Sequence, residues 1–301
     1  MRNIGASVRT KLLNISRQTG RSNEYLLIQY FYERFLYRLG KSKYRNRLIL
    51  KGGMLLISYD SLNRSRPTKD LDFLAKGLPI KADKVKAIIE EILNSADSND
   101  GVLFDANSIQ VEQITEDQDY KGIRVFFVAQ LANTKVKTRL HLDIAVGDSI
   151  VPSPIEMEYP VLLDFEAPKV IAYSKETAIA EKLETIVKRS TANSRLKDFY
   201  DIYYLAQTTN FSLDVLSNSI KSTFMNRGTP LPEETFFPEM IKDDAGMEIR
   251  WKAFISRHGQ LTDISYQELV KKLDSFTRPI MMKNQEESIW DFNTWCWAST
   301  L

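Results

Sequence analysis

The feature that most constrains the fold is the stretch of residues 51–73, KGGMLLISYDSLNRSRPTKDLDF. A short apolar run at residues 48–50 leads into Gly52 and Gly53, and residues 54–59 have the composition of the first turns of a helix. We therefore expect a strand, a tight backbone turn and a helix. A helix that opens on two glycines directs N–H groups and a positive dipole end outward, which suits a triphosphate. The alternative is an ordinary strand-to-helix turn, because short glycine motifs also occur by chance and do not by themselves indicate a phosphate site.

The end of this stretch carries two carboxylates at alternate positions. In a strand over residues 70–73, Asp70 and Asp72 would share one face, while Leu71 and Phe73 would point into the core. Two adjacent carboxylates repel each other unless a cation lies between them. Carboxylate oxygens suit magnesium, which substrate phosphates then help to coordinate. The alternative is a solvated strand edge with alternating acids.

The chain between residues 79 and 165 alternates between helical and strand patterns. A helix is expected over residues 79–94, and the strand patterns follow it at residues 102–104, 108–114, 122–131, 137–146 and 161–165. Short polar connections such as residues 116–122 are typical of hairpins. The pattern predicts an α/β core with a mixed sheet that ends near Pro168.

One of these strands provides a third candidate carboxylate. Arg139, His141 and Asp143 fall on one face of the strand over residues 137–146. We expect Asp143 to be a metal ligand beside Asp70 and Asp72, since a two-metal site needs a further ligand. His141 could sense or orient the site, but we favour a structural imidazole.

Helical patterns dominate both ends of the chain. Residues 4–40 predict two helices, with Ser22 as the cap of the second. Residues 174–190 and 195–205 predict two more, and residues 211–224, 247–255 and 265–276 also have helical patterns. The tail, which holds Trp290, Phe292, Trp295 and Trp297, is expected to form a compact helix. We predict a domain over residues 1–170 and a helical domain over residues 171–301.

The helical part holds two further candidate site residues. Lys182 lies near the apolar face of its helix, where it could enter a cleft and contact a triphosphate. Asp198 and Asp201 are three positions apart and therefore neighbours on their helix. These acids either serve the site or pair with Arg195 or Lys182 in a structural role.

Composition limits the class of protein. The 301 residues carry 41 Lys and Arg against 39 Asp and Glu, a net charge of +2, so any nucleic-acid-binding surface must be local. Cys296 is the only cysteine, which excludes a disulfide within the chain. No uncharged apolar stretch reaches the length of a membrane span or signal peptide. We expect a soluble, cytoplasmic protein without a membrane partner.

Five segments together resemble a known family. LKGGMLL, RPTKDLDF, LHLDIAV, ETAIAEKLETIV and RLKDFYDIYYL occur in this order over roughly residues 50–205. In this they resemble the AbiEii/AbiGii toxin family of bacterial nucleotidyltransferases, the toxic halves of abortive-infection toxin–antitoxin pairs. The resemblance implies a polymerase-β-like nucleotidyltransferase core with N-terminal helices and a mainly helical C-terminal part. It also implies transfer of a nucleoside monophosphate from an NTP to an acceptor, for some members the 3′ end of tRNA, with a cognate antitoxin as a possible partner.

The resemblance assigns roles to particular residues. Gly52 and Gly53 match the phosphate-loop glycines, where the broader signature has Gly-Ser, and Asp70 and Asp72 match the metal carboxylates. Lys182 matches the triphosphate-binding lysine and Asp198 the acid of the last motif. The implied cofactor is Mg²⁺, with Mn²⁺ as the alternative. The catalytic set is thus Asp70, Asp72, Lys182 and Asp198, and the nucleotide-binding set is Lys51, Gly52, Gly53, Arg66, Thr68 and Lys182.

Two other functions fit the same residues. A metal-dependent nuclease would use the acids but would not need the diglycine turn or Lys182. A non-catalytic module that binds an antitoxin would need neither the metal nor the NTP.

Overall fold

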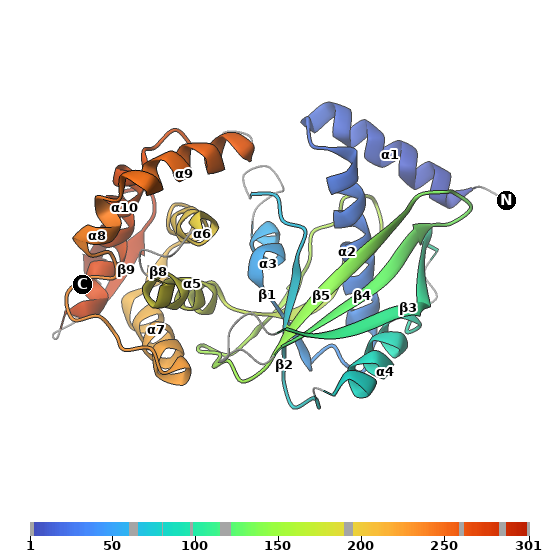
Figure 1. Cartoon of the computed structure of the whole chain (residues 1–301), viewed down its shortest axis with the longest axis horizontal. Coiled ribbons are helices and arrows are strands. Elements are labelled where there is room, and N and C mark those ends of the chain that lie inside the picture. The colour runs from blue at the N-terminus through green and yellow to red at the C-terminus, as the bar shows by residue number, and fades with distance from the viewer. Residues whose placement is uncertain are drawn as a thin grey trace. The chain divides into compact units, whose positions relative to one another are not determined.

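The structure, a computed structural model, divides the chain into two units (Figure 1). The first unit holds most of the chain up to Ala172, and the second holds the chain from Tyr173 onward together with Arg66 and Asp148–Pro154. The structure describes residues 3–59, 66–79, 81–96, 99–114, 122–189, 195–258, 262–282 and 287–299.

A seven-stranded sheet forms the first unit, in the order β3-β4-β5-β2-β1-β7-β6. The strands are β1 Leu48–Lys51, β2 Leu71–Ala75, β3 Val102–Ile114, β4 Gly122–Leu131, β5 Lys137–Ala145, β6 Ile155–Glu158 and β7 Lys169–Ala172. Strand β2 runs parallel to β5 and antiparallel to β1, which in turn runs parallel to β7. The predicted mixed sheet is therefore confirmed.

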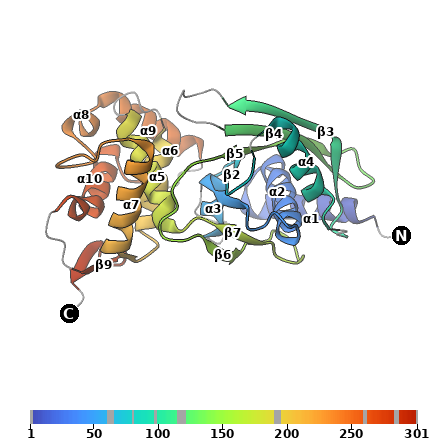
Figure 2. The same cartoon turned by 90° about the horizontal axis from the view of Figure 1, so that it is seen from below.

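Helices cover one face of this sheet. The helices of the unit are α1 Ile4–Thr19, α2 Asn23–Lys41, α3 Gly52–Ser58 and α4 Ala82–Leu93. The hydroxyl of Ser22 accepts the Tyr25 N–H at 3.1 Å, as the predicted cap requires. Phe35 of α2 packs against Phe73 of β2 and Phe127 of β4, with ring centroids 6.2 and 5.5 Å apart. The face that carries Phe73 and Phe127 is thus the core face, and α2 and α4 are seen close to strands β3–β5 in both views (Figure 2).

The other face of strands β2, β4 and β5 carries no such apolar layer. Along β4, the buried residues alternate with the half-buried residues Arg124, Phe126, Val128 and Gln130. Because successive side chains of a strand point to opposite faces, these four lie opposite the helices. We call this side of β2, β3, β4 and β5 the open face.

The second unit is mainly helical. Its helices are α5 Lys175–Arg189, α6 Leu196–Ala206, α7 Leu213–Arg227, α8 Glu239–Lys242, α9 Ala245–Arg257 and α10 Tyr266–Thr277, followed by the 3-10 turn η2 Arg278–Met281. Helix α5 packs against α6 and α7, and α6 also contacts α9 and α10. A small antiparallel sheet, β8 Phe211–Ser212, β9 Ser288–Asp291 and β10 Cys296–Ser299, completes the unit.

The tail is this small sheet and not the helix that we predicted. Trp290 and Trp297 are direct partners across the β9–β10 pair, and the Asp291 carboxylate accepts N–H groups of Asn293 in the turn between the strands. The indole N–H of Trp290 donates to the Ala206 carbonyl at 2.7 Å. Trp290, which is fully buried, therefore belongs to the core of the second unit and reaches it from a strand.

Three predictions about the large sheet also need correction. The sheet does not end near Pro168, because β7 lies between β1 and β6 in it. Residues 161–165 form no strand, and the two strands expected over residues 102–114 are one, β3, with a bulge between Asp105 and Gln110. The connection predicted over residues 116–122 and the predicted end of a helix at residue 190 fall largely outside the described residues.

Across the described ranges, none of the helices combines the length and the apolar character that crossing a bilayer requires.

Candidate active site

A row of charged residues crosses the open face at the level of Asp72. Strand register places Asp72 between Lys51 of β1 and Asp143 of β5, and it places Asp143 beside Arg124 of β4. Side chains at such positions are about 5 Å apart. Two carboxylates therefore lie next to each other between two cations, which is the arrangement that reduces their mutual repulsion.

Asp70 lies one level away on the same face. Leu71 and Phe73 are fully buried, while Asp70 and Asp72 are half-buried, so the predicted alternation along this strand is confirmed. The Asp70 carboxylate lies 3.2 Å from Nε2 of His141. This hydrogen bond raises the pKa of His141, although burial of the ring opposes the rise. His141 is therefore a partner of Asp70 in this structure.

Helix α2 fixes the backbone that carries Asp70. The Tyr32 hydroxyl lies 3.0 Å from the Lys69 carbonyl oxygen and 2.9 Å from that of His141. The side-chain amide of Gln29 donates to the carbonyl of Thr68 at 2.9 Å. The Gln29 contact is buried and the Tyr32 contacts are partly buried, and such hydrogen bonds to backbone carbonyls hold a segment in place. The approach to β2 is thus held by a packed helix.

Gly52 has no room for a side chain. Its φ is +71°, a conformation that residues other than glycine rarely adopt, and a Cβ atom there would lie 2.0 Å from Oδ2 of Asp72. The predicted diglycine turn is present, and α3 begins at Gly52. The glycine lets the backbone of the turn lie directly against the Asp72 carboxylate.

The donor chemistry of the Asp pair fits a hard divalent cation, since Asp70 and Asp72 offer carboxylate oxygens on one face. Asp143, the third predicted ligand, is held by Arg124 through two hydrogen bonds of 2.7 Å. Among the described residues, no three His, Cys, Asp or Glu side chains form a group that could hold a metal ion. In this structure Asp143 is thus paired with Arg124, while Asp70 and Asp72 present their carboxylates on the open face.

The second unit contains the other predicted site residues in one ionic cluster. Nζ of Lys182 lies 2.6 Å from Oδ2 of Asp201 and 3.2 Å from Oδ1 of Asp198. Arg66 donates two hydrogen bonds of 2.8 Å to Asp201, and Arg195 lies 3.1 Å from Asp198. The pairing of the helix acids with Lys182 and Arg195, which we had left open, is therefore present.

The buried charges of this cluster stabilise one another. Burial alone would raise the pKa of Asp201, but Arg66 and Lys182 outweigh it and the pKa lies below its ordinary value. Burial would likewise lower the pKa of Lys182, yet Asp201 and Asp198 raise it. Both groups are therefore charged at neutral pH.

Sequence reasoning missed Arg124 and the role of Asp201. Arg124 is the only charged residue in the strand GIRVFFVAQL, and that isolation was the available signal. Asp201 was noted as a neighbour of Asp198, but the sequence does not show that Arg66, far away in the chain, would pair with it. Lys51 and Thr68 are both buried, and the Thr68 hydroxyl accepts the Asp70 N–H at 3.4 Å.

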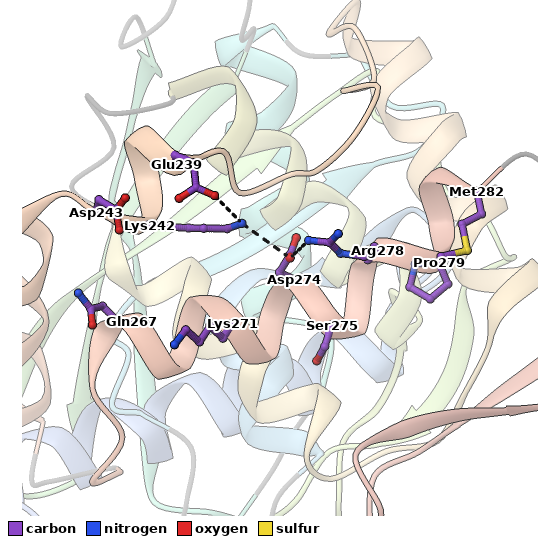
Figure 3. Close-up of a pocket in the computed structure, with 10 residues that line it drawn as sticks. All are labelled: Glu239, Lys242, Asp243, Gln267, Lys271, Asp274, Ser275, Arg278, Pro279 and Met282. Carbon is purple, nitrogen blue, oxygen red and sulfur yellow. Dashed lines mark hydrogen bonds and ion pairs between the residues drawn. The ribbon is translucent and has the colours of Figure 1, made fainter.

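A surface hollow of about 610 Å³ in the second unit is formed by residues of α8, α10 and η2 (Figure 3). Lys242 and Arg278 both pair with Asp274 there, and Lys242 also pairs with Glu239. These cations are neutralised by acids of the same hollow, so it lacks the charge that would select a phosphate.

The fold is that of a nucleotidyltransferase, as comparison with solved structures shows. An H. pylori protein assigned as a nucleotidyltransferase matches with a TM-score of 0.50 and 18% identity, over 87% of this chain and 96% of that chain. JHP933 from Helicobacter pylori matches with a TM-score of 0.49 and 16% identity, over 86% and 93%. No curated protein matches the chain. The predicted fold class is confirmed.

The sequence profile of the nucleotidyl transferase AbiEii toxins of type IV toxin–antitoxin systems matches residues 34–275. The chain belongs to this family, and the predicted resemblance is confirmed.

Proposed function

We propose that the protein transfers a nucleoside monophosphate from an NTP to the 3′ end of an RNA acceptor, most simply tRNA, and thereby blocks translation and growth. Family membership supports nucleotidyl transfer by a toxin. The observation that carries the proposal is the contact between the Gly52 backbone and the Asp72 carboxylate, because it unites a turn without side chains and a candidate metal ligand. A phosphate on that turn would meet a cation held by Asp72.

Asp70 and Asp72 would hold Mg²⁺, or Mn²⁺, on the open face. The bound cation would neutralise the triphosphate and lower the pKa of the attacking hydroxyl. Asp143 accepts two hydrogen bonds from Arg124, and its two oxygens together have further lone pairs with which it could join them. In this proposal, Asp143 would be the third ligand, and Arg124 would bind a phosphate group of the substrate.

The remaining predicted residues would bind the nucleotide. The backbone of Gly52 and Gly53 and the side chain of Lys51 would contact the phosphates from the first unit, together with Thr68. Lys182 and Arg66 are the predicted nucleotide-binding cations of the second unit, where Lys182 donates hydrogen bonds to Asp198 and Asp201. Charge that builds on the departing pyrophosphate is stabilised by such fixed cations.

The reaction is an in-line displacement at the α-phosphorus. The acceptor hydroxyl oxygen forms a bond to the α-phosphorus, the bond from that phosphorus to the bridging oxygen breaks, and pyrophosphate leaves with the electron pair. The hydroxyl proton passes to solvent or to a carboxylate of the site. We place this reaction in the cytoplasm, with a cognate antitoxin as the partner that limits toxicity.

The test incubates the purified protein with each of the four α-labelled NTPs and total cellular RNA. We expect one NTP to label an RNA species of tRNA size, and Asp72→Asn to abolish labelling. Asp83→Asn is the matched control, because Asp83 is an exposed acid of α4 and the same atoms change. Shortened RNA without label would indicate a nuclease, and absence of NTP binding would indicate a non-catalytic module.

A further inference from the structure

The open face continues beyond the carboxylates into an aromatic and cationic surface. At the level of Asp70, strand register places His141 of β5, Phe126 of β4 and Gln110 of β3 side by side. Arg139 lies one step along β5, with its guanidinium carbon 4.0 Å from the centre of the Phe126 ring. We call Gln110, Phe126, Arg139 and His141 the platform.

The side chains of the platform contact one another. The guanidinium of Arg139 lies over the ring of Phe126 and donates a 2.7 Å hydrogen bond to Oε1 of Gln110. The Phe126 and His141 rings have centroids 6.0 Å apart. Phe126 is half-buried and Arg139 is exposed, so this aromatic ring lies on the solvent side of the sheet although an apolar core is available on the other. Bases stack on such rings and on guanidinium planes.

The charge of the adjoining surface favours a polyanion. A hollow of about 450 Å³ continues along the same face, and its lining includes Lys137, Thr138, Arg139 and Gln130. Within the described ranges, neither Lys137 nor Arg139 forms an ion pair. Asp105 also lines the hollow, so its lining carries two cations against one carboxylate. Two cations without acidic partners attract a phosphodiester backbone.

We propose that the platform binds unpaired nucleotides next to the 3′ end of the acceptor RNA. This rests on the proposed function, and it adds the surface and the single-stranded state of the acceptor. Neighbouring strands lie about 4.8 Å apart, so Phe126 lies roughly 10 Å from Asp70, within reach of the last nucleotides of a strand whose end reacts there. Bases inside a duplex stack on their neighbours and have no free face for a side chain, which is why the platform selects a single strand.

The test measures RNA binding without NTP, so that no reaction is needed. The probe is a fluorescein-labelled 12-nucleotide single-stranded RNA, compared with the same RNA in a blunt duplex, and the readout is fluorescence anisotropy of the full-length protein. Phe126→Leu keeps an apolar side chain but removes the ring, and Arg139→Gln removes the charge. The matched control is Lys86→Gln, which removes an exposed charge from α4 on the opposite side of the sheet.

We expect each platform variant to weaken binding of the single strand by about 10-fold, as loss of one stacked base would. Arg139→Gln should also reduce the dependence of binding on salt, and Lys86→Gln should change neither. Equal binding by the platform variants and Lys86→Gln, at unchanged melting temperature, overturns the proposal. Tighter binding of the duplex than of the single strand overturns it as well.

The outcome separates this proposal from the proposed function. Loss of RNA binding in the platform variants supports the proposal that the platform binds RNA, even if no NTP labels any acceptor. In that case only the proposal of nucleotidyl transfer is refuted. If a protein is labelled, and the platform variants bind RNA with the same affinity as Lys86→Gln, the platform proposal is overturned. Nucleotidyl transfer is then still supported.

Discussion

Replacing Gly52 by alanine tests the geometry of the site most sharply. A Cβ at this position would lie 2.0 Å from Oδ2 of Asp72, whereas nonbonded carbon and oxygen atoms approach to about 3 Å, so the carboxylate or the turn must move by about 1 Å. A displacement of about 1 Å at a catalytic group can reduce the rate about 100-fold. We expect nucleotidyl transfer by Gly52→Ala to fall by about this factor.

The chain contains a well-matched control for this change. Gly20, at the end of α1, has the same φ of +71°, but a Cβ there meets nothing within 4 Å. Both variants carry the cost of a left-handed alanine, about 1–2 kcal/mol of unfolding free energy. Only Gly52→Ala also crowds Asp72. We therefore expect Gly20→Ala to lose stability but to keep the activity of the native chain.

The assay is label transfer from the NTP to RNA, with unfolding by denaturant measured in parallel. Adding Asp72→Ala to Gly52→Ala removes the crowded carboxylate, so the double variant should be more stable than the sum of the single changes predicts. Activity of Gly52→Ala equal to that of Gly20→Ala, with additive stabilities, would refute the reasoning.

Three further predictions concern charged groups. Lys182→Met should lower the unfolding free energy by about 3 kcal/mol, since it leaves two buried acids with fewer partners. Because the pKa of Lys182 is raised and that of Asp201 is lowered, denaturant unfolding should show the same loss at pH 5 and at pH 9. A loss at only one of these two pH values would contradict the prediction. Burial raises the pKa of Glu33 to about 7, so the native chain should lose stability as the pH rises from about 4.5 to 7. Glu33→Gln should flatten this dependence of the melting temperature on pH, and an unchanged dependence would count against the prediction. Arg124→Gln releases Asp143 and should lower the Mg²⁺ concentration that gives half-maximal transfer, and an unchanged concentration would show that Asp143 serves only Arg124.

Local patterns in the sequence predicted the elements whose signals are local. The cap at Ser22 and the apolar stripe after it predicted α2, and the alternation around Asp72 predicted the two faces of β2. Such signals depend on residues within one or two turns or strand steps of each other. The positions of Asp70, Asp72 and Gly52 on this part of the fold followed from them.

Short elements and long-range pairs could not be predicted in the same way. Strand β7 has four residues, Lys169–Ala172, too few to show a period, and its place beside β1 depends on strand pairing far apart in the chain. The Arg124–Asp143 pair depends on the register between β4 and β5, and the Arg66–Asp201 pair joins residues 135 positions apart. The prediction for the tail was wrong because β9 and β10 have four residues each, too few to distinguish a strand from a helix.

The central claim is that Asp72 acts on an NTP at the turn formed by Gly52 and Gly53. Its most direct test is transfer of label from each α-labelled NTP to total RNA by the native chain, by Asp72→Asn and by Asp83→Asn. The account predicts labelled RNA with the native chain and with Asp83→Asn, and none with Asp72→Asn. Equal labelling by all three proteins would contradict it.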